Sequence, residues 1–255
     1  MPTLSIILPA YNEADLIGQS LIKLNDYLSK EMGSELVEIL VIINSPASDG
    51  TLAKAKEAVV SFKPSKNHKF IIHDAQKRLG KGGAVKLGMN MAKGRYKLFM
   101  DTDLATPLIH IKKALSLMRE NKSALVIGTR DLSSMHKTLL RRLSSQTSNL
   151  AVQLLILPGF KDTQCGFKMF TSKASDLVFS KLTSTSWSFD TEALLIARQN
   201  KLKIMQLPIE GWKDPKEQGL AGDNQIKVMA DELKELFRVW RRGTKGTYIY
   251  HTDDE

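Results

Sequence analysis

The sequence predicts an α/β fold in which a mostly parallel central sheet is flanked by helices. Short apolar runs alternate along the chain with longer segments whose apolar residues recur at helical spacing. The runs are hydrophobic on both faces, as expected for strands buried between two helical layers. With 255 residues, 42% of them hydrophobic, the chain is long enough to bury a sizeable core.

The individual elements follow from these two patterns. Five runs are mainly apolar or β-branched and are predicted to be strands: Leu4–Leu8, Val37–Ile43, Lys69–Ile72, Tyr96–Met100 and Leu125–Ile127. The segments between them have helical periodicity, as in residues 15–32 and 108–121. This alternation is typical of βαβ units. After about residue 135 the pattern becomes helical and less regular.

The last part of the chain predicts an amphipathic helix. Its apolar residues recur at helical spacing, and basic residues crowd its end. The apolar set is Ile226, Met229, Leu233, Leu236, Phe237 and Trp240, and the basic set is Arg238, Arg241, Arg242 and Lys245. The apolar face can lie on an anionic membrane or pack on the protein's own core, and each can hold for a different part of the helix. Because the chain has no linker or repeat, we expect one domain over residues 1–222, followed by a C-terminal helix and tail over residues 223–255.

Composition narrows the class of protein. A net charge of +10 favours anionic partners, such as nucleic acid, lipid headgroups or phosphorylated small molecules. The single cysteine, Cys165, cannot form an internal disulfide, and no signal-peptide pattern opens the sequence. No apolar stretch approaches the roughly 20 residues that a membrane span requires. We therefore expect a cytoplasmic protein that does not cross a bilayer.

The residues that follow the predicted strands are polar or glycine, and open sheets of this kind bind ligands at the carboxyl ends of their strands. Asp101, Thr102 and Asp103 follow the fourth strand. Two carboxylates at this spacing can converge on a divalent cation whose other ligands are water and phosphate oxygens. Asp101 can equally cap a helix that opens at Pro107, or fix a turn.

Two other segments suit a ligand that carries phosphate. Residues 80–83, Gly-Lys-Gly-Gly, let backbone N–H groups and Lys81 approach a phosphate, or form only a flexible turn. They match neither the Walker phosphate loop nor the GxGxxG fingerprint. Tyr11 and Asn12 can stack on and hydrogen-bond a base, or can begin a helix with an asparagine cap.

Together these segments resemble the family 2 glycosyltransferases, which have the nucleotide-diphospho-sugar-binding GT-A fold. The resemblance runs from Leu4 to about Trp212, and its motifs agree in order. They are IILPAYNE at 6–13, SDGT at 48–51, GKG at 80–82 and, at the metal-binding DxD position, DTD at 101–103. Two later segments, DTQCGFK at 162–168 and WSFDTE at 187–192, resemble signatures of the dolichyl-phosphate glucosyltransferases and mannose synthases.

The resemblance implies metal-dependent, inverting transfer of a hexose from a nucleotide sugar to a polyprenyl or dolichyl phosphate, with UDP-glucose favoured over GDP-mannose. It implies that Asp101 and Asp103 hold Mg²⁺ or Mn²⁺, and that Asp190 lies near the acidic catalytic residue of inverting members. The implied donor-binding residues are Pro9, Tyr11, Glu13, Asn44, Asp49, Lys81, Asp101, Thr102 and Asp103, and the further motif residues are Gln164, Cys165, Gly166, Trp187 and Glu192.

The chain departs from the family pattern in three places. Asn44 and Ser45 stand where paired aspartates are common, which removes negative charge from the expected nucleoside pocket. Residues 213–219 replace a Gly-Ser-Lys element of the glucosyltransferases, and no membrane segment like that of eukaryotic members precedes residue 4. The donor class is therefore supported by more motifs than the acceptor is.

A phosphate acceptor would simplify the chemistry and needs cations. Its second pKa is about 6, so it is already ionised near neutral pH, and Asp190 can orient the sugar instead of acting as a base. Of the basic residues after the fifth strand we favour Arg130 and Arg141 for this phosphate, with a solvated basic helix face as the alternative.

The expected partners are a nucleotide-sugar donor, a polyprenyl-phosphate acceptor and the cytosolic face of a membrane, to which the protein would bind peripherally. Nucleic acid is not expected, because the interleaved aromatic and basic residues of single-strand binders are missing. Two alternatives stay open: a soluble family 2 glycosyltransferase with a non-lipid acceptor, and a non-catalytic α/β domain that binds nucleotides or nucleic acid.

Overall fold

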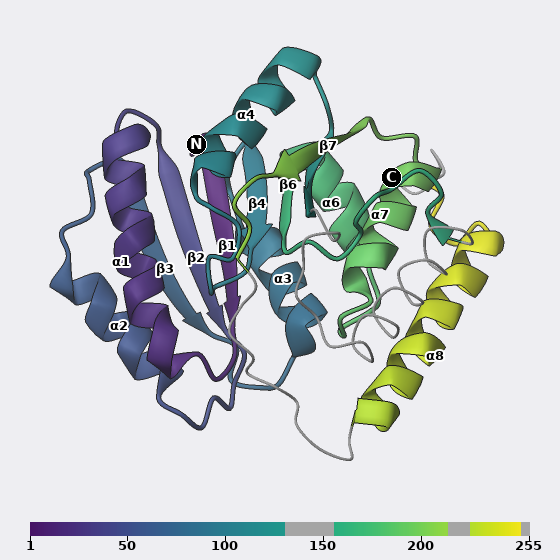
Figure 1. The fold of residues 1–255 in the computed structure, drawn as a ribbon, viewed down its shortest axis with the longest axis horizontal. Coiled ribbons are helices and arrows are strands. Elements are labelled where there is room, and N and C mark those ends of the chain that lie inside the picture. The colour runs from purple at the N-terminus through teal and green to yellow at the C-terminus, as the bar shows by residue number, and fades with distance from the viewer. Residues whose placement is uncertain (131–155, 214–224, 251–255) are drawn as a thin grey trace.

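The computed structural model has one seven-stranded sheet between two layers of helices (Figure 1). It describes residues 1–130, 156–213 and 225–250, and side chains from residue 231 onward in the last range. The strands are β1 (Leu4–Ala10), β2 (Val37–Ile43), β3 (His68–Asp74), β4 (Tyr96–Met100), β5 (Leu125–Arg130), β6 (Phe167–Thr171) and β7 (Ile204–Ile209). Their order is β3-β2-β1-β4-β6-β5-β7, and only the pairs that include β6 are antiparallel. The predicted α/β fold with a mostly parallel sheet is confirmed.

Helices cover both faces of the sheet (Figure 1). One face packs against α1 (Ala14–Glu31), α2 (Thr51–Ser61) and α4 (Ile109–Asn121). The other packs against α3 (Gly80–Met91), α6 (Ser172–Lys181) and α7 (Phe189–Gln199), and α8 (Gln225–Thr244) lies against α7. The central strands are therefore buried on both faces, which is why they are hydrophobic throughout.

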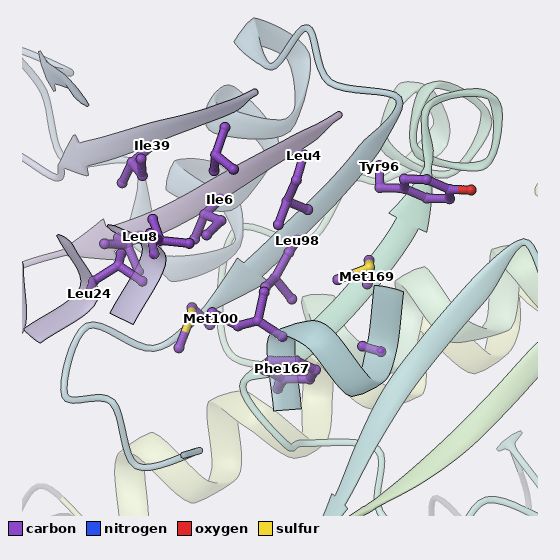
Figure 2. Close-up of a cluster of buried hydrophobic side chains, with 14 of the residues drawn as sticks. Leu4, Ile6, Leu8, Leu24, Ile39, Tyr96, Leu98, Met100, Phe167 and Met169 are labelled. Carbon is purple, nitrogen blue, oxygen red and sulfur yellow. The ribbon is translucent and has the colours of Figure 1, made fainter. Parts of the chain in front are cut away.

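Strand β1 shows how the two faces are filled. Leu4, Ile6 and Leu8 point into the cluster beneath α1, where Figure 2 shows them beside residues of β4. Ile7 points the opposite way, into the cluster beneath α3. Each such side chain contributes about 1.5–3 kcal/mol on burial, so a polar residue at any of these positions would be strongly destabilising.

The first helix forms because its apolar residues fall on one stripe. Ile17, Leu21, Leu24 and Leu28 are spaced so that all four face the sheet, and all are fully buried. The predicted helices at 15–32 and 108–121 are confirmed to within one residue at either end, as α1 and α4.

The structure also differs from the sequence prediction. Strands β6 and β7 were not predicted, because β6 contains a lysine, Lys168, and β7 contains a proline, Pro208. Strand β7 lies at the edge of the sheet, where a proline is tolerated. Strand β1 continues to Ala10, so Pro9 lies inside the strand and not after it. Parallel pairing of β1 with β2 continues through Pro9 to Ala10, whereas pairing with β4 ends at Ile7.

The order of strands creates one topological switch point in the sheet. Strand β1 pairs with β2 on one side and β4 on the other, so the chain reverses its direction of travel across the sheet at this point. In open α/β sheets such a switch point is where ligands bind, outside the carboxyl ends of the strands. The register pairs Ile7 with Phe99, and the hydroxyl of Thr102 donates to the carbonyl of Pro9 at 2.7 Å, so the ends of β1 and β4 lie side by side.

The C-terminal helix has one buried and one exposed side. Val239 of α8 and Tyr248 beyond it are buried in the cluster beneath α7, whereas Leu233, Phe237 and Trp240 are exposed. The expected boundary between residues 222 and 223 lies outside the described residues, so the domain division stays a prediction. Among the helices that the structure describes, none combines the length and the apolar character that crossing a membrane would demand.

Candidate active site

The acidic pair at the end of β4 lies at the open edge of the sheet. The backbone N–H of Asp101 donates to the carbonyl of Gly166 at 3.1 Å, and Asp103 Oδ1 accepts from the N–H of Ala105 at 2.9 Å. Both aspartates are partly exposed, while Thr102 between them is buried. The two carboxylates therefore lie partly exposed at the carboxyl edge of the sheet and are not enclosed in the core.

Gly166 forms the floor beneath Asp101. Antiparallel pairing of β4 with β6 sets Met100 opposite Phe167, so Gly166 lies against Asp101. A Cβ atom at position 166 would lie 1.8 Å from Asp101 Oδ2, much closer than any van der Waals contact allows. A side chain at position 166 would therefore displace the Asp101 carboxylate, which gives the predicted motif residue Gly166 a steric role.

Lys81 forms an ion pair with the first of these acids. Its Nζ lies 2.6 Å from Asp101 Oδ1 and 4.6 Å from the centre of the Trp187 ring. Burial lowers the pKa of Lys81, but the nearby Asp101 and Asp190 carboxylates outweigh that effect, and the pKa is raised above its ordinary value. The positive charge of Lys81 is therefore favoured beside the acidic pair.

The start of α3 is held so that Lys81 reaches Asp101. The side-chain oxygen of Asn44 accepts from the N–H of Leu79 at 2.6 Å, and the N–H of Gly82 donates to the carbonyl of Thr185 at 3.0 Å. Gly80 has φ +72, and a Cβ there would lie 2.2 Å from the Thr185 carbonyl oxygen. The glycines thus allow the loop before α7 to pack directly on the N-terminus of α3.

Negative charge accumulates around the acidic pair. The pKa of Glu13 is raised to about 7, mainly by burial and in addition by the negative charges of Asp103, Asp101 and Asp49. The pKa of Asp103 is also raised, first by burial and then by Asp101. Excess negative charge of this kind is what a bound divalent cation would neutralise.

The residues present fit a divalent cation that shares its coordination with a ligand. Within residues 1–130, 156–213 and 225–250, no three His, Cys, Asp or Glu side chains converge on one point. Asp101 and Asp103 alone could hold Mg²⁺ or Mn²⁺ only if water and the diphosphate of a ligand completed the shell, which is the usual arrangement for Mg²⁺. The metal site therefore stays a prediction that the chemistry of these donors supports.

The other residues expected around the nucleoside lie at the same edge of the sheet. The guanidinium of Arg78 lies 4.9 Å from the centre of the half-exposed Tyr11 ring. Asp49 accepts hydrogen bonds from the N–H groups of Ala14 and Thr51, at 2.9 and 3.0 Å, and so caps the starts of α1 and α2. The carbonyl oxygen of Pro9 and the side-chain oxygen of Asn44 each accept a hydrogen bond from within the protein. Nucleoside contacts from this set stay a prediction.

The residues expected to bind an acceptor phosphate have different outcomes. Arg130 forms a bidentate ion pair with the fully buried Asp162, through Nε at 2.6 Å and Nη2 at 3.0 Å. Burial raises and Arg130 lowers the pKa of Asp162, with a net decrease. Arg141 lies outside the described residues. A role for either arginine in acceptor binding stays a prediction. In Arg130, the Nε and Nη2 donors are already bound to Asp162.

Most residues of the two later motifs, at 162–168 and 187–192, are buried. Asp190 is only 3% exposed, and its Oδ1 lies 2.5 Å from Nζ of Lys168. Burial raises the pKa of Asp190, a shift that Lys168 and Lys81 oppose. Cys165 is fully buried, whereas Gln164 is exposed.

Glu192 holds the loop that carries Trp187. Its carboxylate accepts from the N–H of Thr183 at 3.0 Å, the N–H of Ser184 at 2.6 Å and the hydroxyl of Tyr248 at 2.7 Å. Trp187 itself is 54% exposed. Glu192 is therefore a positioning residue for a rigid loop that presents one aromatic ring to solvent beside Lys81.

Three residues of the site were not singled out from the sequence: Asp162, Lys168 and Arg78. The clearest signal was Lys168, a lysine inside the apolar run Phe167–Phe170, because a charged residue in a buried strand must have a partner. Asp162 opens the DTQCGFK segment at 162–168 that resembles a family signature, but no role was assigned to it individually. Arg78 carries no comparable signal, since an isolated charge in a loop is usually solvated.

A family model described as "Glycosyl transferase family 2" matches residues 5–179, more than half of the chain. The chain belongs to glycosyl transferase family 2. Among its curated relatives are a dolichyl-phosphate beta-glucosyltransferase of Trichomonas vaginalis, 32% identical over 91% of this chain and 72% of the relative. The Saccharomyces cerevisiae enzyme of the same name is 30% identical over 89% of this chain and 72% of its own length.

Solved structures confirm the GT-A type of fold for this glycosyltransferase. Mannosyl-3-phosphoglycerate synthase from Rubrobacter xylanophilus matches with a TM-score of 0.67 at 16% identity, covering 99% of this chain and 77% of that one. Glucosyl-3-phosphoglycerate synthase from Mycobacterium tuberculosis, in complex with Mn²⁺, UDP and glucosyl-3-phosphoglycerate, matches with a TM-score of 0.59 at 17% identity, covering 98% and 82%. At this level of identity the likeness concerns the fold.

Removal of the Lys81 ammonium should affect cation and nucleotide binding in opposite directions. In Lys81→Met, Asp101 loses a competing cation, so Mn²⁺ should bind the nucleotide-free glycosyltransferase about threefold to tenfold more tightly. UDP with Mn²⁺ should bind at least about tenfold more weakly, because a charged hydrogen bond to phosphate is lost. Isothermal titration calorimetry measures both. Lys86→Met is the matched control, since Lys86 Nζ donates to the Leu182 carbonyl and not to a carboxylate; weaker Mn²⁺ binding by Lys81→Met would contradict the ion-pair interpretation.

Glu13 should make the metal-free protein less stable at higher pH. Its folded pKa of about 7 exceeds the ordinary value of 4.5, so its contribution to stability is full below pH 4.5 and is lost as the pH rises through 7. Glu13→Gln should therefore be more stable than wild type at pH 8, by about 1–2 kcal/mol after allowance for partial exposure, and should show no advantage at pH 4.5. Urea unfolding at the two pH values measures this difference. Equal effects of the substitution at both would show that the carboxyl is not perturbed.

Proposed function

We propose that this glycosyltransferase transfers a hexose from a nucleotide sugar to dolichyl phosphate or another polyprenyl phosphate. The observation that carries the proposal is the pair Asp101 and Asp103, which lies partly exposed at the switch point of the sheet beside the ammonium of Lys81. Two curated relatives that match about nine-tenths of the chain are named dolichyl-phosphate beta-glucosyltransferases, which supports this acceptor and a glucosyl donor. We therefore favour UDP-glucose over GDP-mannose.

Different residues would bind the diphosphate and the nucleoside of the donor. Asp101 and Asp103 would hold Mg²⁺ or Mn²⁺, which when bound supplies neutralising charge for the departing diphosphate. Lys81 would add a second positive charge at the same place. Tyr11, Glu13, Asn44 and Asp49 would contact the nucleoside.

An acceptor phosphate requires little help from a base. One of its oxygens attacks the anomeric carbon of the hexose as the bond from that carbon to the nucleoside diphosphate breaks, which inverts the configuration. Because the second pKa of a phosphate monoester is about 6, the nucleophile is already an anion at neutral pH. This agrees with the position of Asp190, which is 3% exposed and paired with Lys168.

A lipid acceptor would be met at a membrane surface, and α8 supplies a suitable face. Leu233, Phe237 and Trp240 are exposed along one side of the helix, and the rings of Phe237 and Trp240 lie 5.6 Å apart. The basic residues Arg238 and Arg241 are their neighbours in sequence, whereas Arg242 donates to the hydroxyl of Thr183 on the side that packs on the protein. We propose that α8 binds peripherally to the cytosolic face of a membrane through these residues.

Charge-neutral substitutions in the acidic pair test the proposed transfer. Asp101→Asn and Asp103→Asn should each lower transfer of labelled glucose from UDP-glucose to a short polyprenyl phosphate with Mn²⁺ by about 100-fold or more, because transition-state charge is no longer neutralised. Asp176→Asn, on an exposed aspartate of α6, is the control. GDP-mannose and 3-phosphoglycerate, tested in the same assay, distinguish other donors and a non-lipid acceptor. Undiminished transfer in both variants would rule out the proposed site.

Vesicle binding tests the role of α8. Phe237→Asp should weaken co-sedimentation with vesicles of phosphatidylcholine and phosphatidylserine about tenfold or more, because an exposed aromatic side chain contributes about 1.5–3 kcal/mol when buried in lipid. Val60→Asp on α2 is the matched control, since Val60 is also an exposed apolar residue, 86% exposed, far from α8 in the fold (Figure 1). If both variants bind vesicles as the wild type does, α8 is not the membrane-binding face.

A further inference from the structure

A lysine buried beneath the candidate site has no role in the proposed transfer. Lys168 lies in β6, and its side chain has no exposed surface. Moving an ammonium group from water into a protein interior costs several kcal/mol unless the group is paired and hydrogen-bonded. A lysine at this position therefore persists only where specific partners compensate its charge.

Two groups hold the ammonium of Lys168. Its Nζ lies 2.5 Å from Oδ1 of Asp190 and donates to the carbonyl of Cys165 at 2.7 Å. The next carbonyl along the chain, that of Gly166, accepts the N–H of Asp101. Lys168 thus binds the first turn of α7 and also the loop that forms the floor beneath Asp101.

Asp190 extends this arrangement to Lys81. It lies in the first turn of α7, where the helix N-terminus favours a carboxylate. The start of α7 packs on the start of α3, since a Cβ atom at Gly82 would lie 2.6 Å from Cβ of Phe189, so Asp190 and Lys81 are each adjacent in sequence to one of two residues in contact. The negative charge of Asp190 helps to raise the pKa of Lys81. The Nζ of Lys81 lies 2.6 Å from Asp101 Oδ1 and over the ring of Trp187. The four charged groups follow one another with alternating sign, from Lys168 through Asp190 and Lys81 to Asp101.

We infer that Lys168 is a positioning residue for donor binding, acting through Asp190 on Lys81. When a divalent cation binds Asp101, Lys81 loses part of its counterion, and Asp190 remains as the fixed anion behind it. Lys168 keeps that anion in place and so keeps Lys81 directed toward the diphosphate of the donor. The inference rests on the proposed function, and in it Asp190 acts on Lys81 and not on the acceptor.

Binding of UDP in the presence of Mn²⁺, with no acceptor present, tests this inference. Lys168→Met should bind UDP about tenfold more weakly than wild type. The double variant Lys81→Met/Lys168→Met should bind no more weakly than Lys81→Met alone, because residues that act as a unit are not additive. Without an acceptor, any loss of a catalytic base is not measured.

Two further variants separate positioning from mere stability. Lys97→Met is the matched control, because Lys97 is a buried lysine of β4 whose Nζ pairs with Asp176 at 2.8 Å, away from Lys81; it should leave UDP binding unchanged. Lys168→Gln/Asp190→Asn replaces the ion pair with two amides that can hydrogen-bond each other, so it removes both buried charges together. This amide pair should fold and should show the same loss of UDP binding as Lys168→Met.

The outcomes distinguish the inference from the function on which it rests. Wild-type affinity for UDP in Lys168→Met or in the amide pair would overturn the inference, and so would a loss that adds to that of Lys81→Met. If Lys168→Met does not fold, the amide pair decides alone. Wild-type protein that binds neither UDP nor GDP with Mn²⁺ would contradict the proposed function itself, whereas intact wild-type binding with unaffected variants would contradict only the inference.

Discussion

The ion pair between Lys81 and Asp101 joins the two parts of the protein on which the site depends. Asp101 lies at the carboxyl end of a central strand, and Lys81 lies at the start of a helix that covers one face of the sheet. Several acidic groups lie close together at this edge of the sheet. Burial, and to a lesser extent their mutual repulsion, raise the pKa of Glu13 and Asp103. A fixed cation at this point reduces that repulsion. The same excess of negative charge is the physical reason for expecting a divalent cation when a diphosphate is bound.

The second half of the chain provides much of the support for this charge arrangement. Strand β6 inserts antiparallel between β4 and β5, and it brings Gly166 beneath Asp101 and Lys168 beneath Asp190. The loop before α7 is held by the buried carboxylate of Glu192 and packs on the glycines of α3. These segments contact the acidic pair and Lys81 from below and from the side, so the site is built from both halves of the sequence. A change in the second half can therefore alter donor binding without touching the donor.

The segment that follows α8 connects this helix to the loop before α7. Tyr248, which follows α8, donates to Glu192, and Val239 of α8 is buried against the same hydrophobic cluster as α7. One side of α8 is therefore fixed to the core, while the side that carries Phe237 is left exposed. Packing on the core therefore holds for one side of the helix, while membrane binding by the exposed side stays a proposal.

Local pattern determined a large part of this protein. Strands buried on both faces must be apolar throughout, so β1, β2 and β4 could be predicted from sequence, and the acids after β4 stood out because they end such a run. Tertiary structure alone decided the rest. The antiparallel β6 could not be predicted, because its lysine is tolerated only where Asp190 and the Cys165 carbonyl compensate the charge. Likewise, Arg130 looked free in the sequence but pairs with Asp162, 32 residues later in the chain. Periodicity records which residues face a core, whereas the pairing of buried charges depends on contacts between segments that are distant along the chain.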